Sequence, residues 1–223
     1  MIVCANSKGG VGKSTLATHL AVWLFDQGFQ TALIDTDKQR SSSQWIGEVE
    51  PKITVRVADT PEECLTSAQE LIASHDFVVG DAPGGLEDLS RTLLILADLA
   101  IFPISPSILD VRSVAGATTV LRYAQGINGG KPEGRLVLNK MKTRDTISHE
   151  LREDAPKLGL QVAQHVIRDL QAYRDAAQQG TVVGRFGRKG LQAAADMDAL
   201  FTELVGEQIA QLTHQRRQQV ENG

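Results

Sequence analysis

The sequence predicts an α/β fold, in which a single doubly wound, mostly parallel sheet carries helices on both of its faces. Short, continuously apolar segments alternate with longer amphipathic segments along the chain, and this alternation is typical of parallel strands that are buried on both sides. A glycine-rich loop lies between the first strand-like segment and the first helix-like segment. No internal repeat or low-complexity linker divides residues 1–223, so we expect one domain.

The predicted elements follow one another in a regular order. Apolar and β-branched runs predict strands at residues 2–6, 31–35, 53–58, 77–81, 99–104, 136–139 and 161–167. The spacing of apolar side chains predicts helices at residues 16–27, 61–74, 111–123, 170–178 and from 191 past 212. Thr60 followed by Pro61 is a typical helix start. Residues 128–132, Asn-Gly-Gly-Lys-Pro, are expected to form a loop.

The composition excludes several classes of protein. The chain has 42% hydrophobic and 22% charged residues, as ordinary globular proteins do. The most apolar segment, residues 93–104, contains Asp98, and no run approaches the roughly 18 apolar residues of a membrane span. The start of the chain shows no signal-peptide pattern. Cys4 and Cys64 are too few for a disulfide scaffold or a four-cysteine metal site, and they suit a reducing cytoplasm.

The loop at residues 7–15, Ser-Lys-Gly-Gly-Val-Gly-Lys-Ser-Thr, has the context of a phosphate-binding loop, because it joins a strand to a helix. Its glycines let backbone N–H groups approach an anion without an intervening Cβ, and the dipole of the following helix favours negative charge there. Lys13 is expected to neutralise the β- and γ-phosphates, and the Ser14 hydroxyl to bind Mg²⁺. The predicted nucleotide-binding residues of the loop are Gly9, Gly10, Val11, Gly12, Lys13, Ser14 and Thr15.

Carboxylates follow two other predicted strands, at the edge where ligands of such sheets bind. Asp35 and Asp37 come after the second strand and are placed to reach a metal ion or a water molecule beside the γ-phosphate. A solvated acidic turn is the alternative for this pair. Asp81 ends the apolar run at residues 77–80 and has the position of an aspartate that binds Mg²⁺.

Asn139 follows the strand-like residues 136–138 and favours adenine as the base. Its amide can donate one hydrogen bond and accept another, which matches the N6 and N7 edge of adenine. GTPases have Asn-Lys-x-Asp at this point and use the Asp to read guanine, whereas this chain has Lys142 there. The alternative role for Asn139 is to cap the turn from strand to loop.

Together these segments resemble the ParA/MinD family of ATPases. The string K-G-G-V-G-K-S-T at residues 8–15 resembles the deviant Walker A box, with a second lysine ahead of the glycines. Residues 35–39 resemble the Asp-x-Asp-Pro-Gln box of the ParA family, with Lys38 in place of the proline, and this resemblance extends to Ser42 and Trp45. The resemblance extends to Asp81 with Pro83, residues 102–107, Asn139 and residues 180–183. The chain is similar to a small ParA-type ATPase without the N-terminal helix-turn-helix domain.

The resemblance implies a single P-loop ATPase domain over residues 1–223 that binds ATP and Mg²⁺ and forms an ATP-sandwich dimer. Lys8, Lys13 and Asp37 would be catalytic: Lys8 would reach across to the partner's phosphates, and Asp37 would position the attacking water. Asp35 would support the Mg²⁺ site. The resemblance also implies slow ATP hydrolysis stimulated by a ParB-like or other cargo adaptor, and nonspecific DNA binding on the nucleoid of the cytoplasm. The cargo would be a plasmid, a chromosome or another large assembly.

The charge distribution predicts where DNA binds. The net charge is −4, yet residues 131–190 hold 12 basic against 7 acidic residues. Within this block, Arg185, Arg188 and Lys189 bring three cations together before the final helix, and with Arg168 and Arg174 they are expected to form one strip. No recognition helix or aromatic ladder is evident, so phosphate contacts are expected to dominate over base contacts.

Four alternative functions bear on the same residues. A MinD-like regulator that binds membranes would need an amphipathic end, but residues 213–223 contain one apolar residue in eleven, so no membrane partner is expected. An iron–sulfur relative would need paired cysteines. A small-molecule ATP-dependent enzyme on the same fold, and a scaffold that binds ATP without hydrolysing it, both stay open.

Overall fold

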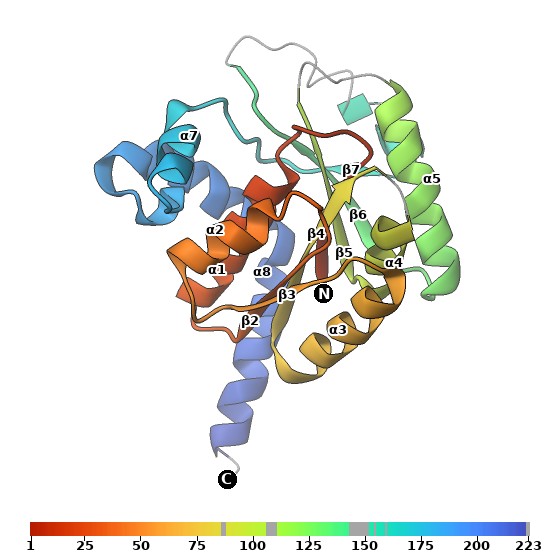
Figure 1. Cartoon of the computed structure of the whole chain (residues 1–223), viewed down its shortest axis with the longest axis horizontal. Coiled ribbons are helices and arrows are strands. Elements are labelled where there is room, and N and C mark those ends of the chain that lie inside the picture. Colours follow the sequence, from red (N-terminus) through yellow and green to blue (C-terminus); the bar gives the residue numbers. More distant parts are fainter. Residues whose placement is uncertain (86–87, 106–110, 143–151, 154, 159, 222–223) are drawn as a thin grey trace.

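One sheet of seven parallel strands forms the centre of the computed structural model (Figure 1), as the sequence predicts. The structure describes residues 1–85, 88–105, 111–142, 152–153, 155–158 and 160–221, so Pro106 and Ser107 of the family resemblance lie outside the described residues. The strands are β1 (Ile2–Asn6), β2 (Thr31–Asp35), β3 (Thr54–Val57), β4 (Phe77–Gly84), β5 (Leu99–Ile104), β6 (Glu133–Leu138) and β7 (Gln161–Val162). Their order is β3-β2-β4-β1-β5-β6-β7. Because all described pairs are parallel, the carboxyl ends of β1, β2 and β4 meet at one edge.

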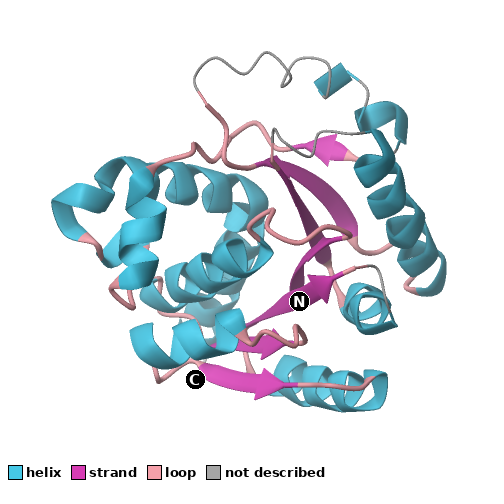
Figure 2. Cartoon of the chain, turned by 45° about the horizontal axis from the view of Figure 1, so that its top comes forward, coloured by secondary structure: helices cyan, strands magenta, loops and turns pink. Residues whose placement is uncertain are grey.

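Helices cover both faces of this sheet (Figure 2). They are α1 (Lys13–Asp26), α2 (Ser41–Val49), α3 (Pro61–Ser74), α4 (Asp88–Leu96), α5 (Val111–Ile127), α7 (Gln171–Gln178) and α8 (Leu191–Glu221). Short 3₁₀ turns lie at Ala155–Leu158, Val183–Arg185 and Gly187–Gly190. The buried residues of α1, α2, α7 and α8 share one apolar core, and those of α3, α4 and α5 share the other.

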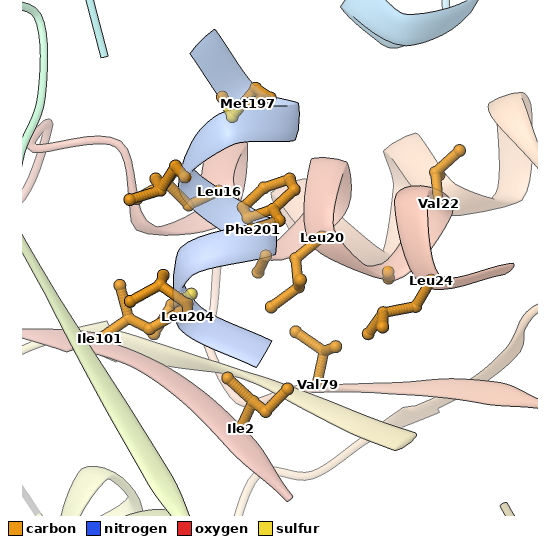
Figure 3. Packing of buried hydrophobic residues seen from close by; sticks show 14 of the residues in the cluster. Ile2, Leu16, Leu20, Val22, Leu24, Val79, Ile101, Met197, Phe201 and Leu204 are labelled. Carbon is orange, nitrogen blue, oxygen red and sulfur yellow. The ribbon is translucent and has the colours of Figure 1, made fainter. Parts of the chain in front are cut away.

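The central strand serves both cores, because successive side chains of a strand point to opposite faces. Ile2 belongs to the core under α1 and α8, and its neighbour Val3 belongs to the core under α4 and α5. In the first core, Leu20 of α1 and Phe201 of α8 lie above the sheet (Figure 3). Burial on both faces explains why the strands are continuously apolar in the sequence.

Several predicted boundaries are wrong. The strand expected at residues 161–167 is the two-residue β7, and the helix expected to end at Tyr123 continues to Ile127. Helix α1 begins at Lys13, three residues earlier than Leu16, directly after the glycines. The helices α2 and α4 were not predicted. Helix α2, with the sequence SSSQWIGEV, buries only Ser42 and Ile46, so its apolar periodicity is too weak to read.

Other local predictions are confirmed. Thr60 caps α3 by accepting a hydrogen bond from Glu63 N, and the Glu63 side chain completes the capping box. The turn at residues 128–132 joins α5 to β6. Helix α8 is 31 residues long, and its last turns extend beyond the body of the molecule (Figure 1). Near that end, Arg216 pairs with Asp76 and lies 5.1 Å above the centre of the Phe29 ring.

Candidate nucleotide-binding site

The loop between β1 and α1 takes its path from its glycines. Gly10 and Gly12 have φ values of 75° and 98°, which residues with a Cβ rarely adopt. A Cβ at Gly12 would lie 2.2 Å from Asn139 Nδ2. At the start of the loop, Asn6 Oδ1 accepts a hydrogen bond of 3.0 Å from Lys8 N. These features are what a phosphate-binding loop requires, since its backbone must turn sharply and approach an anion.

The Lys13 side chain lies beneath this loop and is 6% exposed. Its Nζ donates a hydrogen bond of 3.3 Å to the carbonyl oxygen of Lys8. Burial lowers the pKa of Lys13, and the charges of Asp81 and Asp37 oppose this effect. The ammonium group is therefore beside both carboxylates and the loop, where it can neutralise the phosphates that the loop binds.

Asp81 of β4 places an unsatisfied carboxylate in the interior. It is fully buried, and neither oxygen has a complete hydrogen bond among the described residues. Burial raises the pKa of Asp81 to about 7, and the Ser14 and Ser42 hydroxyls moderate this shift without reaching full hydrogen-bond geometry. A buried carboxylate without partners is costly, so the arrangement fits a carboxylate whose partner is a bound cation.

The loop after β2 is held by side chains. Asp35 is fully buried, and its two carboxylate oxygens accept hydrogen bonds from Asp37 N (3.0 Å) and from Ser43 N (2.9 Å) in α2. Asp35 thus shapes the loop and satisfies the start of α2. Asp37 is half-buried, accepts a bond of 2.9 Å from Gln39 N, and acts electrostatically on Lys13. Asp37 therefore lies near Lys13 of the phosphate loop, and Asp35 lies near Asp81.

Asn139, at the end of β6, is tied to the same loop. Its Nδ2 donates to the Val11 carbonyl at 2.7 Å, and its Oδ1 accepts from Lys140 N at 2.9 Å. Lys140 in turn sends its Nζ to the Gly10 carbonyl at 2.7 Å. The amide therefore supports the loop in this structure, and adenine recognition by Asn139 stays a prediction.

The residues at this edge fit Mg²⁺ and ATP. No three His, Cys, Asp or Glu residues converge as a metal site within the described part of the chain. A hard ion such as Mg²⁺ does not need such a cage, because it keeps water and binds phosphate oxygens together with one or two protein ligands. Asp81 and Ser14 would supply those ligands, and the glycine loop with Lys13 would hold the phosphates.

Further residues support the site from behind. Ser42, which the sequence includes in the ParA-like box, lies beside Asp81, and Arg40 bonds to the Asp35 carbonyl at 3.0 Å. His19 of α1 is buried and bonds through Nδ1 to the Thr15 carbonyl and through Nε2 to Val183 N, at 2.8 and 3.2 Å. Sequence reasoning missed Arg40 and His19, and only the hydrophobic context of His19 offered a signal.

The three predicted DNA-binding cations have different surroundings. Arg185 is bound to Asp26 and Glu50 through ion pairs of 2.5 and 3.0 Å. Arg188 and Lys189 are exposed and form no ion pair with the described residues. The charge count along the sequence treats all three alike, but in the folded chain Asp26 and Glu50 largely neutralise Arg185.

The neighbouring cations of the basic block are neutralised too. Arg168 pairs with Asp196 at 2.7 Å, and Arg174 pairs with Asp169 at 3.0 Å. A continuous positive strip from Arg168 to Lys189 is therefore not what the structure presents. The exposed pair Arg188 and Lys189 is what is left of it.

A cavity of about 680 Å³ lies at the opposite edge of the sheet, away from these loops. Its lining includes Met1, Asp98, Lys131 and Gln215. None of the predicted site residues lines it.

Among the described helices, none is both long enough and apolar enough to cross a bilayer.

Comparison with known proteins identifies the family. Residues 2–183 match the CbiA family, described as the CobQ/CobB/MinD/ParA nucleotide binding domain. The maintenance of carboxysome distribution protein A of Halothiobacillus neapolitanus is 29% identical over 211 residues, covering 92% of this chain and 95% of that protein.

Solved structures show the same fold. An ATP complex of an aspartate-to-alanine variant of McdA from Cyanothece has a TM-score of 0.71 and 18% identity, and the match covers 92% of this chain and 95% of that one. The septum site-determining protein MinD of Pyrococcus horikoshii, complexed with Mg-ADP, has a TM-score of 0.69 and 19% identity, with 93% and 97% covered. With its phosphate loop, its buried aspartate and a family match over most of its length, the chain belongs to the CobQ/CobB/MinD/ParA family and is a nucleotide-binding ATPase of the ParA/MinD type.

Proposed function

We propose that this chain is a positioning ATPase that dimerises on ATP, binds DNA without sequence preference and hydrolyses ATP slowly to segregate a large cargo. The observation that carries the proposal is the second lysine of the phosphate loop. Lys8 adds an ammonium group to a loop that Lys13 already serves from below. An additional cation is accounted for if it neutralises the phosphates of a second nucleotide, bound by a symmetric partner.

The residues divide the work of hydrolysis. The loop backbone and Lys13 bind and orient the phosphates. Asp81 and Ser14 would hold Mg²⁺, which would neutralise part of the phosphate charge. Asp37 is half-buried beside Lys13, where its carboxylate can orient a water molecule and accept its proton. Asp35 keeps Asp37 in place through the bond to its N–H. Asp37→Ala should therefore bind ATP and not hydrolyse it; turnover at the wild-type rate would show that Asp37 has no such role.

Dimerisation is tested by light scattering with ATP, ADP and a non-hydrolysable ATP analogue. ATP and the analogue should double the mass of the wild-type protein, and ADP should not. Lys8→Ala should stay monomeric under all three conditions. Lys52→Ala is the matched control, because Lys52 is an exposed lysine away from the loop. A Lys8→Ala protein that dimerises as well as wild type would remove the cross-subunit role.

DNA binding is proposed to use Arg188 and Lys189. Both side chains are exposed and form no ion pair with the described residues. Affinity for random duplex DNA should fall with salt, with a log–log slope of about −0.9 for each phosphate contact. Replacing both residues by Ala should flatten the slope by about two contacts in each subunit. Removing Lys52 and Arg56, two exposed cations near the edge strand β3, should leave it unchanged. An unchanged slope in the variant without Arg188 and Lys189, together with a flatter slope in the variant without Lys52 and Arg56, would place the DNA-binding surface elsewhere.

The nucleoid is the proposed track, and a ParB-like or other adaptor the proposed partner. A plasmid, a chromosome or a protein assembly would be carried by the same cycle. A small-molecule enzyme on this fold is the competing function. Turnover that DNA and an adaptor stimulate supports positioning, whereas turnover that depends on a metabolite and ignores DNA supports the enzyme.

A further inference from the structure

Two residues other than glycine have positive φ in the described chain, and both are basic and lie at the nucleotide site. Arg40 has φ 56° and Lys140 has φ 57°, a left-handed conformation that a Cβ disfavours. Each sends its side chain to a backbone carbonyl of a site loop, Arg40 to Asp35 and Lys140 to Gly10. Such strain persists where surrounding contacts enforce it, and it gathers at functional sites.

Arg40 closes the β2–α2 loop, residues 36–40, which carries Asp37. Its backbone N–H donates to the Asp37 carbonyl at 3.0 Å, and its own carbonyl accepts from Gln44 N at 3.1 Å, inside α2. Its guanidinium turns back across the loop, where one nitrogen bonds to the Asp35 carbonyl at 3.0 Å and the other pairs with Asp59 beyond β3. The loop is therefore held between α2 and the edge of the sheet.

At the tip of the loop, Gln39 N donates to the Asp37 carboxylate at 2.9 Å, whereas Lys38 is not restrained in this way. Lys38 stands where the family resemblance calls for proline, so no ring fixes φ at this position. Lys38 and Gln39 are both exposed, and the Lys38 N–H makes no hydrogen bond with the described residues. A restraint that proline supplies through its ring would have to come from contacts across the loop.

We propose that Arg40 is a positioning residue for ATP hydrolysis, whose guanidinium clamp keeps the Asp37 carboxylate facing Lys13. The proposal rests on the proposed role of Asp37. The ion pair with Asp59 alone contributes little, because Asp59 is 67% exposed. The bond to the Asp35 carbonyl acts on the residue that also fixes the Asp37 N–H, and small displacements of a reacting group lower rates steeply.

Two substitutions at position 40 separate the clamp from the backbone strain. Arg40→Ala removes the clamp and keeps the strain, whereas Arg40→Gly removes both. Each should lower kcat by about 10- to 100-fold, with ATP affinity changed by less than about threefold, because the phosphate loop is untouched. The Gly variant should melt at a higher temperature than the Ala variant. Arg56→Ala, which removes an exposed cation of β3, is the matched control and should keep wild-type kcat.

Rescue tests whether restraint is what Arg40 supplies. Lys38→Pro removes no described hydrogen bond, and in the Arg40→Gly background it should recover kcat at least about threefold. A double variant no faster than Arg40→Gly would overturn the proposal, as would wild-type kcat in either single variant. An equal loss of ATP affinity and kcat would also overturn it, because it marks general damage to the site.

Asp37→Ala is measured in parallel, so that the two proposals fail separately. Wild-type turnover in Asp37→Ala would remove the proposed role of Asp37 and the role of Arg40 with it. An inactive Asp37→Ala protein beside fully active Arg40 variants would remove the role of Arg40 alone.

Discussion

The loops after β1 and β2 reach the same site by opposite means. The first loop bends because Gly10 and Gly12 permit positive φ, and the side chains of Lys13 and Asn139 bond to its carbonyl groups. The second loop bends around the Asp35 carboxylate and the Arg40 guanidinium, with positive φ imposed on a residue that has a Cβ. The first path is possible because glycine has no Cβ. The second is maintained by side chains that form hydrogen bonds within the loop. The difference teaches that neighbouring loops of one site respond to quite different substitutions.

The largest effect is expected where the glycine path is blocked. Gly12→Ala should lower ATP affinity by at least about 100-fold, or about 2.7 kcal/mol, because its Cβ would lie 2.2 Å from Asn139 Nδ2 at a φ of 98°. Calorimetric titration with ATP measures this loss. Gly9→Ala is the folding control, because no described atom lies within 4 Å of its Cβ, and it should melt as wild type does. Normal ATP binding by Gly12→Ala would show that this loop does not depend on glycine.

The second loop should break at Asp35. Asp35→Asn turns an amide toward one of the two N–H groups that the carboxylate accepts, leaving a buried donor unpaired. We expect the free energy of unfolding to fall by about 2–3 kcal/mol, as measured by urea titration. Asp59→Asn, at a carboxylate that is 67% exposed, should change it by less than about 0.5 kcal/mol. Equal stability of the two variants would contradict the view that side chains enforce this loop.

A smaller, pH-dependent effect should come from His19, which supports the phosphate-loop helix from behind. Burial lowers the pKa of His19 to about 4, while the unfolded chain has a pKa of about 6.5. As the pH falls, the unfolded state therefore takes up a proton at His19 before the folded state does. The contribution of neutral His19 to the free energy of unfolding is fully present above about pH 6.5 and is lost as the pH falls toward 4. Between pH 7.5 and 5 the loss should be about 2 kcal/mol.

Comparison with His19→Gln isolates this contribution. Urea titrations at several pH values should show a decline in the wild type that is steeper than in the variant by up to about one proton. If the free energies of unfolding of the two proteins change with pH in parallel, His19 is not held in its neutral form by its hydrogen bond from Val183 N.

The smallest effect concerns Asp81, which lies between the two loops. Asp81→Asn should stabilise the nucleotide-free protein by about 1 kcal/mol, because a buried charge without complete hydrogen bonds is removed. The same variant should lose the dependence of ATP binding on Mg²⁺. Thermal melting with and without Mg²⁺ and ATP measures both outcomes. A destabilised variant would show that the carboxylate has partners in the free protein.

The same contrast explains what the sequence could predict. The phosphate loop can be predicted because its glycines, Lys13 and Ser14 lie close together in the sequence, and the role of each follows from its residue type. Asp81 is readable because it directly follows the apolar run at residues 77–80. Arg40 is not, since its proposed role depends on a side-chain bond to the Asp35 backbone carbonyl and on a φ value, and no pattern of residue types reveals either.

The ion pairs of Arg185 and the presence of helix α2 could not be read from the sequence for related reasons. Arg185 counts as a free cation along the sequence, but Asp26, 159 residues away, and Glu50 neutralise it in the fold. Helix α2 escaped prediction because most of its residues are polar and only two are buried. It forms because Asp35 accepts from Ser43 N at its start and Ile46 packs into the core.

The hydrogen bonds of the two indoles have a spectroscopic consequence. The chain has two tryptophans; Trp45 of α2 donates to the Thr181 carbonyl at 3.1 Å, and Trp23 of α1 donates to Asp198 at 2.9 Å. Trp45 lies on the helix that begins at the β2–α2 loop, with its ring 5.4 Å from that of His19. In a Trp23→Phe protein, all indole emission would come from Trp45, so the wavelength and lifetime of the fluorescence would report the state of α2 in real time, without a label.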